Sequence, residues 1–180
     1  MQYCKFAFYG ALLSLLFTGC ATFSNDGGLA DVQALTAPHL KQDVVWPKDE
    51  ASQNVVTERV RALLKAPLNA DSAVQIALLN NKGLQASLYA LGIAEADVVQ
   101  AGRLPNPKFS MLYARHQGEY KIEQALTFNI FSLLAMPKVL EIERRNFEKT
   151  KQAVAIDVLN LANETRAAYF NAERIVNEHK

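Results

Sequence analysis

The sequence predicts a mainly α-helical fold that contains one β-hairpin. Long stretches place apolar residues at helical spacing, and two of these stretches keep a seven-residue period. Between those two stretches, two short runs alternate apolar and polar residues around a turn. Glycine and proline, at 8 and 6 of 180 residues, leave long segments uninterrupted. We therefore expect long coiled-coil-like helices on either side of two strands.

Residues 1–19 have the pattern of a secretory signal peptide. The cation Lys5 precedes an apolar run over residues 11–17, and Thr18-Gly19-Cys20 follows. This ending resembles a bacterial lipoprotein signal, in which the thiol of Cys20 is diacylated and the new amine is acylated. Ala21 in the next position favours the outer membrane by the rule for such lipoproteins. An ordinary signal peptide with an incidental Cys20 is the alternative.

Residues 20–50 are predicted to form a lipid-anchored N-terminal tether. The part from Ala21 to Pro47 looks irregular, because glycines, prolines and polar residues punctuate it. Trp46, the only tryptophan, is expected to dock the end of this tether against the fold. Stacking of Trp46 on a ligand is the alternative.

Three helices are expected before the hairpin. The first covers residues 51–65 and ends before Pro67, and the second has Asp71 as its N-cap and ends at Asn80. The third resumes at Leu84 and runs to about Gly102. Its seven-residue period consists of Leu84, Leu91 and Val98, with Leu88 between. Small neighbouring residues predict that this helix packs closely against another helix.

Residues 108–130 have the pattern of two strands joined by a turn. In the first run, Phe109, Met111 and Tyr113 lie on one side, and Lys108, Ser110, Leu112 and Ala114 lie on the other. In the second run, Ile122, Leu126, Phe128 and Ile130 lie on one side, with Gln124 as the exception, and Lys121, Glu123, Ala125, Thr127 and Asn129 lie on the other. Strands of ~9–11 residues span a bilayer when tilted. A hairpin in a soluble sheet with one buried face fits the same alternation, and the pattern alone favours it.

The segment from Pro137 to Lys180 is predicted to be one long helix, with Pro137 in the first turn. Its seam is Leu140, Phe147, Val154, Leu161, Ala168 and Ile175, which stand seven apart. A second, wetter side combines Val158, Thr165 and Ala172 with the charged Arg144 and Lys151. At 1.5 Å per residue the helix would be roughly 65 Å long, more than a compact domain of this chain length accommodates. We therefore expect it to pack on partners.

Composition and missing motifs exclude several functional classes. A formal net charge of +1, with no basic stripe, argues against a nucleic-acid partner. The sequence has no glycine-rich phosphate loop, no Gly-x-Ser-x-Gly and no His-Glu-x-x-His. His39, His116 and His179 lie on the tether, the turn and the end of the chain, without a ligand set nearby. We expect no enzymatic activity, no metal site and no cofactor apart from the covalent lipid on Cys20.

The part from about residue 50 to residue 180 resembles the outer membrane factor (TolC) family of efflux channels. The matching motifs, in chain order, are Ala77-Leu78 with Asn80-Asn81, Leu84-Gln85-Ala86, Gln100-Ala101-Gly102-Arg103 and Pro105-Asn106-Pro107. Lys82-Gly83 departs from the Asn-Pro that the family often has at this helix junction. The resemblance implies that residues 51–180 are the first helix–strand–strand–helix repeat of an outer-membrane efflux channel, half of a TolC-like protomer with two transmembrane barrel strands.

In that family, three protomers supply twelve strands to one barrel and form a periplasmic helical tunnel. The resemblance therefore implies a homotrimer when full length. It also implies a passive duct that exports drugs, metals or other small solutes, and that docks on an inner-membrane pump through a periplasmic adaptor. A family protomer has four strands and this sequence has two, so we expect the chain to be truncated.

The resemblance also implies roles for the two faces of the hairpin. Ser110, Glu123, Thr127 and Asn129 would line the pore. Phe109, Met111, Tyr113, Ile122, Leu126, Phe128 and Ile130 would face lipid. The segment from His116 to Tyr120 would be the extracellular turn.

Other features leave alternatives open. Glu141, Glu143, Arg144 and Arg145 form a charge cluster that suits surface pairing, with gating as the alternative. Asp157 and Glu164 share one stripe, which faces either the tunnel or solvent. For the chain as a whole, the alternative is a periplasmic coiled-coil lipoprotein with a structural or adaptor role.

Overall fold

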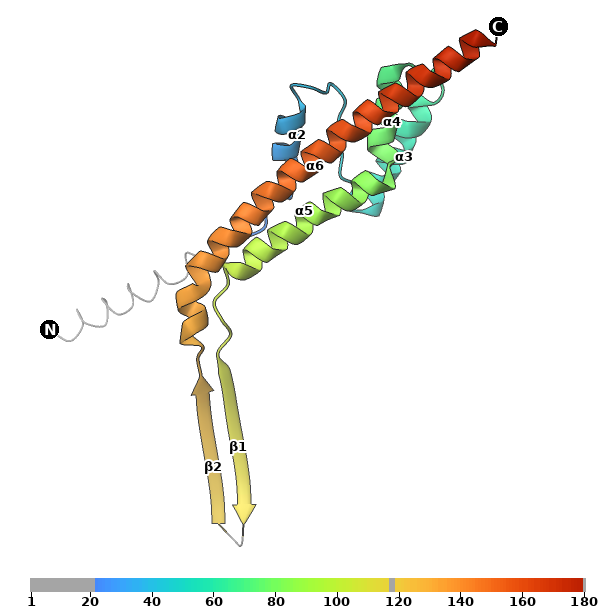
Figure 1. Cartoon of the computed structure of the whole chain (residues 1–180). Helices are drawn as coiled ribbons and strands as arrows, with labels where there is room; N and C mark the ends of the chain where they lie inside the picture. Colours follow the sequence, from blue (N-terminus) through green and yellow to red (C-terminus); the bar gives the residue numbers. More distant parts are fainter. Residues whose placement is uncertain (1–21, 117–118, 180) are drawn as a thin grey trace, which may run out of the picture. The chain divides into compact units, whose positions relative to one another are not determined.

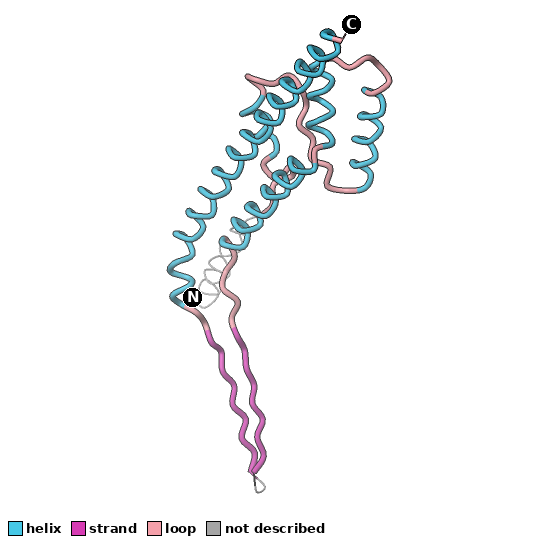
Figure 2. The backbone as a smooth tube through the Cα atoms, turned by 45° about the vertical axis from the view of Figure 1, so that its right-hand side comes forward, coloured by secondary structure: helices cyan, strands magenta, loops and turns pink. Residues whose placement is uncertain are grey.

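The computed structural model describes residues 22–116 and 119–179. These residues form five helices and one antiparallel two-stranded hairpin (Figure 1, Figure 2). The elements are α2 (Leu29–Thr36), α3 (Glu50–Leu63), α4 (Ala70–Asn80), α5 (Lys82–Ala101), β1 (Lys108–His116), β2 (Glu119–Thr127) and α6 (Ile130–Glu178). The expectation of a mainly helical fold with one hairpin is confirmed.

The chain forms two compact units. Of the described residues, the helical unit contains 23–96 and 145–179, and the hairpin unit contains 97–144 together with Thr22. The boundaries fall within α5 and within α6, so each of these helices supplies residues to both units.

Two capping boxes set where α3 and α4 begin. The Asp49 carboxylate accepts a hydrogen bond from the Ser52 backbone N–H at 2.7 Å, and the Ser52 hydroxyl accepts one from the Asp49 N–H. Asn69 and Ser72 make the same reciprocal pair. The prediction of Asp71 as the second N-cap is therefore wrong, because Asn69 satisfies the free N–H groups and Asp71 falls in the first turn.

A single residue, Asn81, separates α4 from α5. Its backbone is extended, with φ −69° and ψ 119°, and this ends α4. Its side-chain oxygen accepts a hydrogen bond from the Leu84 N–H at 2.9 Å, as an N-cap does for the helix that follows. The predicted break is confirmed, and α5 resumes at Lys82, slightly earlier than expected.

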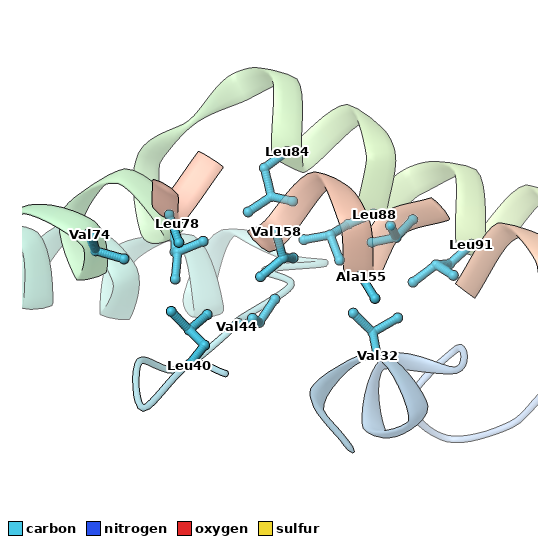
Figure 3. Close-up of a cluster of buried hydrophobic side chains, with 12 residues drawn as sticks. Val32, Leu40, Val44, Val74, Leu78, Leu84, Leu88, Leu91, Ala155 and Val158 are labelled. Atoms are coloured by element: carbon cyan, nitrogen blue, oxygen red, sulfur yellow. The ribbon is translucent and has the colours of Figure 1, made fainter. Parts of the chain in front are cut away.

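The helical unit is built around one apolar core (Figure 3). The helices α4, α5 and α6 contribute Val74, Leu78, Leu84, Leu88, Leu91, Val154, Ala155, Val158 and Ala162. Full burial of a leucine or valine side chain is worth about 1.5–3 kcal/mol. This core is therefore the main source of stability in the helical unit.

The buried stripe of α6 is wider than the predicted seam. Phe147, Val154 and Leu161 of that seam belong to the core or pack against it, whereas Ala168 and Ile175 are exposed. On the side that we expected to be wetter, Lys151 and Val158 are buried, so that expectation is wrong at these two residues, whereas Arg144 and Ala172 are exposed. A straight helix has 3.6 residues per turn, and its buried stripe drifts across a strict seven-residue repeat.

The segment from residue 22 to residue 47 is more ordered than an irregular tether. It contains α2, and its Val32, Leu40 and Val44 belong to the core (Figure 3). The prediction that this whole segment is irregular is therefore wrong. The apolar residues recur at helical spacing, but Gly27-Gly28 and Pro38 mask so short a pattern.

The long helix α6 begins at Ile130, and not at Pro137 as predicted. The Asn129 side-chain oxygen accepts a hydrogen bond from the Ser132 N–H at 3.0 Å and caps the new start. Pro137 thus lies inside the helix, where it cannot donate to the Leu133 carbonyl.

Candidate membrane-contacting hairpin

The register of the hairpin sorts its side chains into two faces. Phe109 pairs with Leu126, Met111 with Gln124 and Tyr113 with Ile122. Because side chains alternate along each strand, these six lie on one face of the sheet. The intervening pairs, which include Ser110 with Ala125 and Leu112 with Glu123, lie on the other. The alternation predicted over residues 108–127 is confirmed.

Nothing in the described residues covers the apolar face. Phe109 is 67% exposed and Leu126 is 71% exposed, and Met111, Tyr113 and Ile122 are exposed as well. Both outer edges of the sheet also lack a strand partner in the described part of the chain. A two-stranded hairpin with an uncovered apolar face is at best marginally stable in water. This hairpin therefore presents an apolar surface that calls for a partner or a bilayer.

Three predicted site residues lie outside the strands. The strand β2 ends at Thr127, so Phe128 and Asn129 lie in the connection to α6, and Ile130 is the first residue of that helix. Placing these three residues on strand faces is therefore wrong. The Asn129 side chain caps α6, and this bond ends the strand earlier than the alternating pattern suggests.

Aromatic residues gather near the tip of the hairpin. The ring centroids of Tyr113 and Tyr120 are 6.2 Å apart, and the Arg115 guanidinium lies 5.5 Å from the Tyr120 ring. His116 and Glu119 form the last backbone pair, and residues 117–118 of the predicted turn lie outside the described residues. Tyrosine and arginine together suit a boundary between an apolar and an aqueous phase.

The other face carries the polar groups predicted to line a pore. Lys121 and Glu123 form an ion pair along β2, and Ser110 and Thr127 are exposed on the same face. Leu112 is the large apolar exception on this face. The face therefore combines charged and hydroxyl groups, which water solvates well.

The buried Lys151 of α6 binds the N-terminal segment through an ion pair with Asp31. The Lys151 ammonium donates to Asp31 and to Glu148, each at 2.6 Å, while its side chain is only 7% exposed. Burial alone lowers the pKa of Lys151, but the hydrogen bonds to the two carboxylates outweigh burial and raise this pKa above its ordinary 10.5. The sequence pattern placed Lys151 on a wet side, and only the fold brings Asp31 to it.

Two further contacts hold the same segment. The Ser24 backbone N–H donates to Glu95, a buried carboxylate on α5, at 2.6 Å. The Trp46 ring packs against Gly92 and meets Tyr89 edge-on at 5.9 Å, so the predicted docking of Trp46 is confirmed. Gly27 has φ 71°, and a Cβ there would lie 2.7 Å from the same ring. Cys20, the predicted lipid attachment residue, lies outside the described residues.

The acidic residues of α6 considered in the sequence analysis line a cavity or make common polar contacts. Asp157 and Glu164 line one cavity of about 380 Å³ in the helical unit, where Asp157 accepts a hydrogen bond from the Ser87 hydroxyl at 2.7 Å. Glu141 pairs with Lys138 at 2.8 Å. Across residues 22–116 and 119–179, no three His, Cys, Asp or Glu side chains are grouped so that they could hold a metal ion.

Comparison of the chain with protein-family models, with curated proteins and with solved structures finds no match. Among the helices of the described residues, none has the length and apolar character needed to cross a membrane.

Proposed function

We propose that the chain is a subunit of an outer-membrane efflux channel, the passive duct of a tripartite export system. The observation that carries this proposal is the two-faced hairpin. A soluble sheet buries its apolar face on a core, and the described residues provide no such cover for Phe109, Met111 and Leu126. The hydrocarbon of a bilayer would cover that face, and the polar face would line a water-filled pore.

The open edges of the hairpin support assembly with further strands. In a bilayer every backbone N–H and C=O needs a partner, so strands cross only as closed barrels. We infer that additional strands, including those of other copies in a homotrimer, pair with β1 and β2. Ser110, Glu123 and Thr127 would then face the lumen. Phe109, Met111, Tyr113, Ile122 and Leu126 would face lipid.

The remaining parts of the proposal concern location and partners. A lipid on Cys20 would anchor the mature chain to the outer membrane, because several acyl chains bind a bilayer firmly. The helices would form the periplasmic part, which a periplasmic adaptor and an inner-membrane pump would engage. These assignments rest on the order of motifs in the sequence.

A periplasmic coiled-coil lipoprotein with a structural or adaptor role is the second candidate. The helical unit favours it, since its core draws on α4, α5, α6 and the N-terminal segment and includes no residue of the hairpin. The uncovered apolar face of the hairpin opposes it, because a periplasmic protein would expose that face to water.

Met111 and Leu112 provide a matched test of the proposal. They are neighbours on β1, they are large, apolar and similarly exposed, and they lie on opposite faces. In cells, we expect Met111→Cys to react with a lipid-soluble carbene probe and Leu112→Cys to react with an aqueous maleimide. Reaction of both cysteines with the aqueous reagent alone would refute the channel and favour the second candidate.

A further inference from the structure

The start of α6 carries the most exposed large apolar side chains in the described residues. Phe131 is 87% exposed and Leu134 is 72% exposed, and Ile130 beside them is also exposed. Successive residues of a helix lie 100° apart, so Ile130, Phe131, Leu133 and Leu134 cover an arc of about 160°. Ser132 lies opposite the middle of this arc. The first two turns of α6 therefore form an apolar surface, interrupted only at Ser132, that nothing in the described residues covers.

The charge pattern suits a lipid interface at this place. Residues 124–137 contain no charged side chain, and Lys138 is the first to follow. The eight residues 130–137 rise about 12 Å along the helix. Interfacial helices bury their apolar face about 5–10 Å into the boundary between headgroups and acyl chains. The uncharged part of α6 is therefore at least as long as that boundary is deep.

Chain connectivity places this surface next to the hairpin. The strand β2 ends at Thr127, and α6 begins at Ile130. Three residues of chain span at most about 11 Å, and both elements belong to the hairpin unit. If the hairpin crosses a bilayer, the first turns of α6 lie at the surface of that bilayer. The first turn of α6 has free backbone N–H groups, and Pro137 leaves the Leu133 carbonyl without its helical donor, but water in the headgroup region can bond to these groups.

We propose that residues 130–137 form an interfacial collar, in which Phe131 and Leu134 insert into the headgroup region of the phospholipid bilayer that the hairpin spans. This inference rests on the proposed function, since a spanning hairpin brings the collar to the bilayer. With this collar, the surface that contacts lipid extends beyond the end of β2 as far as Pro137. Lys138 and its partner Glu141 mark the return to water.

Lipid-borne quenching of a fluorophore tests the collar. The full chain is reconstituted in vesicles of phosphatidylethanolamine and phosphatidylglycerol that contain a lipid brominated near its headgroup. Single bimane-labelled cysteines replace Phe131, Ser132, Phe109 in the hairpin, or Phe170 in the charged part of α6, and the unsubstituted chain reports labelling of its own cysteines. We expect quenching at Phe131→Cys to be at least about threefold stronger than at Ser132→Cys or Phe170→Cys.

The outcomes separate the collar from the channel. Quenching at Phe109→Cys without quenching at Phe131→Cys would overturn the collar and leave the channel standing. Absence of quenching at both positions would overturn both proposals. A cysteine at position 131 that is unquenched and also protected from aqueous maleimide would mean that a protein partner covers this surface, which overturns the collar.

A double substitution provides a second measurement. Phe131→Ser with Leu134→Ser should weaken binding of the chain to the same vesicles about tenfold, because two apolar side chains leave the interface. Phe170→Ser, which removes an exposed phenylalanine of the same helix, should leave binding unchanged. Circular dichroism confirms that each variant keeps its helices. Equal binding by the double variant and Phe170→Ser would overturn the collar.

Discussion

The two units of this chain treat their apolar residues in opposite ways. In the helical unit, Leu88 and Leu91 are fully buried in a core shared by three helices and the N-terminal segment. In the hairpin unit, Phe109 and Leu126 are equally apolar and stay largely exposed. The helical unit can therefore derive its stability from its own packing, whereas the hairpin needs a surface from outside.

The largest expected effect compares one substitution in both units. Leu91→Ala should lower the free energy of unfolding by about 2–5 kcal/mol, since it leaves a cavity in a packed core. Leu126→Ala should change it by less than about 0.5 kcal/mol, because the side chain is exposed on the hairpin. Urea unfolding in mild detergent, followed by helical circular dichroism, measures both. An equal loss in the two variants would mean that the hairpin packs on the helices.

An intermediate effect compares two asparagine caps. Asn69→Ala should cost about 1 kcal/mol of unfolding free energy, because α4 loses its capping box and contributes to the core. Asn129→Ala removes a similar cap at the exposed start of α6, so it should fray that end without a change in global unfolding. Hydrogen exchange at the Ser72 and Ser132 amides reports the local effects. A lower free energy of global unfolding in Asn129→Ala would mean that the hairpin unit and the core unfold together.

The smallest effect compares two lysines. Lys151→Met keeps the packing but removes a buried ammonium, and should cost less than about 1 kcal/mol at neutral pH because Asp31 and Glu148 are exposed and regain water. Lys121→Met, which breaks the exposed pair on β2, should not affect the helical core.

The pH dependence sharpens this comparison. The raised pKa of Lys151 means that its contribution is fully present below its unfolded pKa of about 10.5 and is lost as pH rises through the higher folded pKa. The free energy of unfolding, measured between pH 9 and pH 12, should fall in this way in the wild type and in Lys121→Met, but not in Lys151→Met. The same alkaline loss in Lys151→Met would assign it to another group.

Local patterns predicted most of the helices and strands. The break near Asn81, the two hairpin strands and the ends of α3 all follow from caps, turn residues and apolar period within a few residues. The errors fall where two local signals compete. Pro137 suggested a helix start, and the Asn129 cap prevailed because its bond to Ser132 satisfies a free N–H group. Gly27-Gly28 suggested a loose tether, and the short helix α2 follows them directly.

The sequence alone predicted the types of α3 to α6 and of both strands, and the alternation within each strand, because alternation and helical period are properties of a few neighbouring residues. Only the tertiary structure decided what the faces of these elements meet. It brought Val32 and Asp31 to α6, buried Lys151 between carboxylates, and left Phe131 and Leu126 uncovered. Burial depends on residues far apart in the chain, and no local pattern specifies which of them come together.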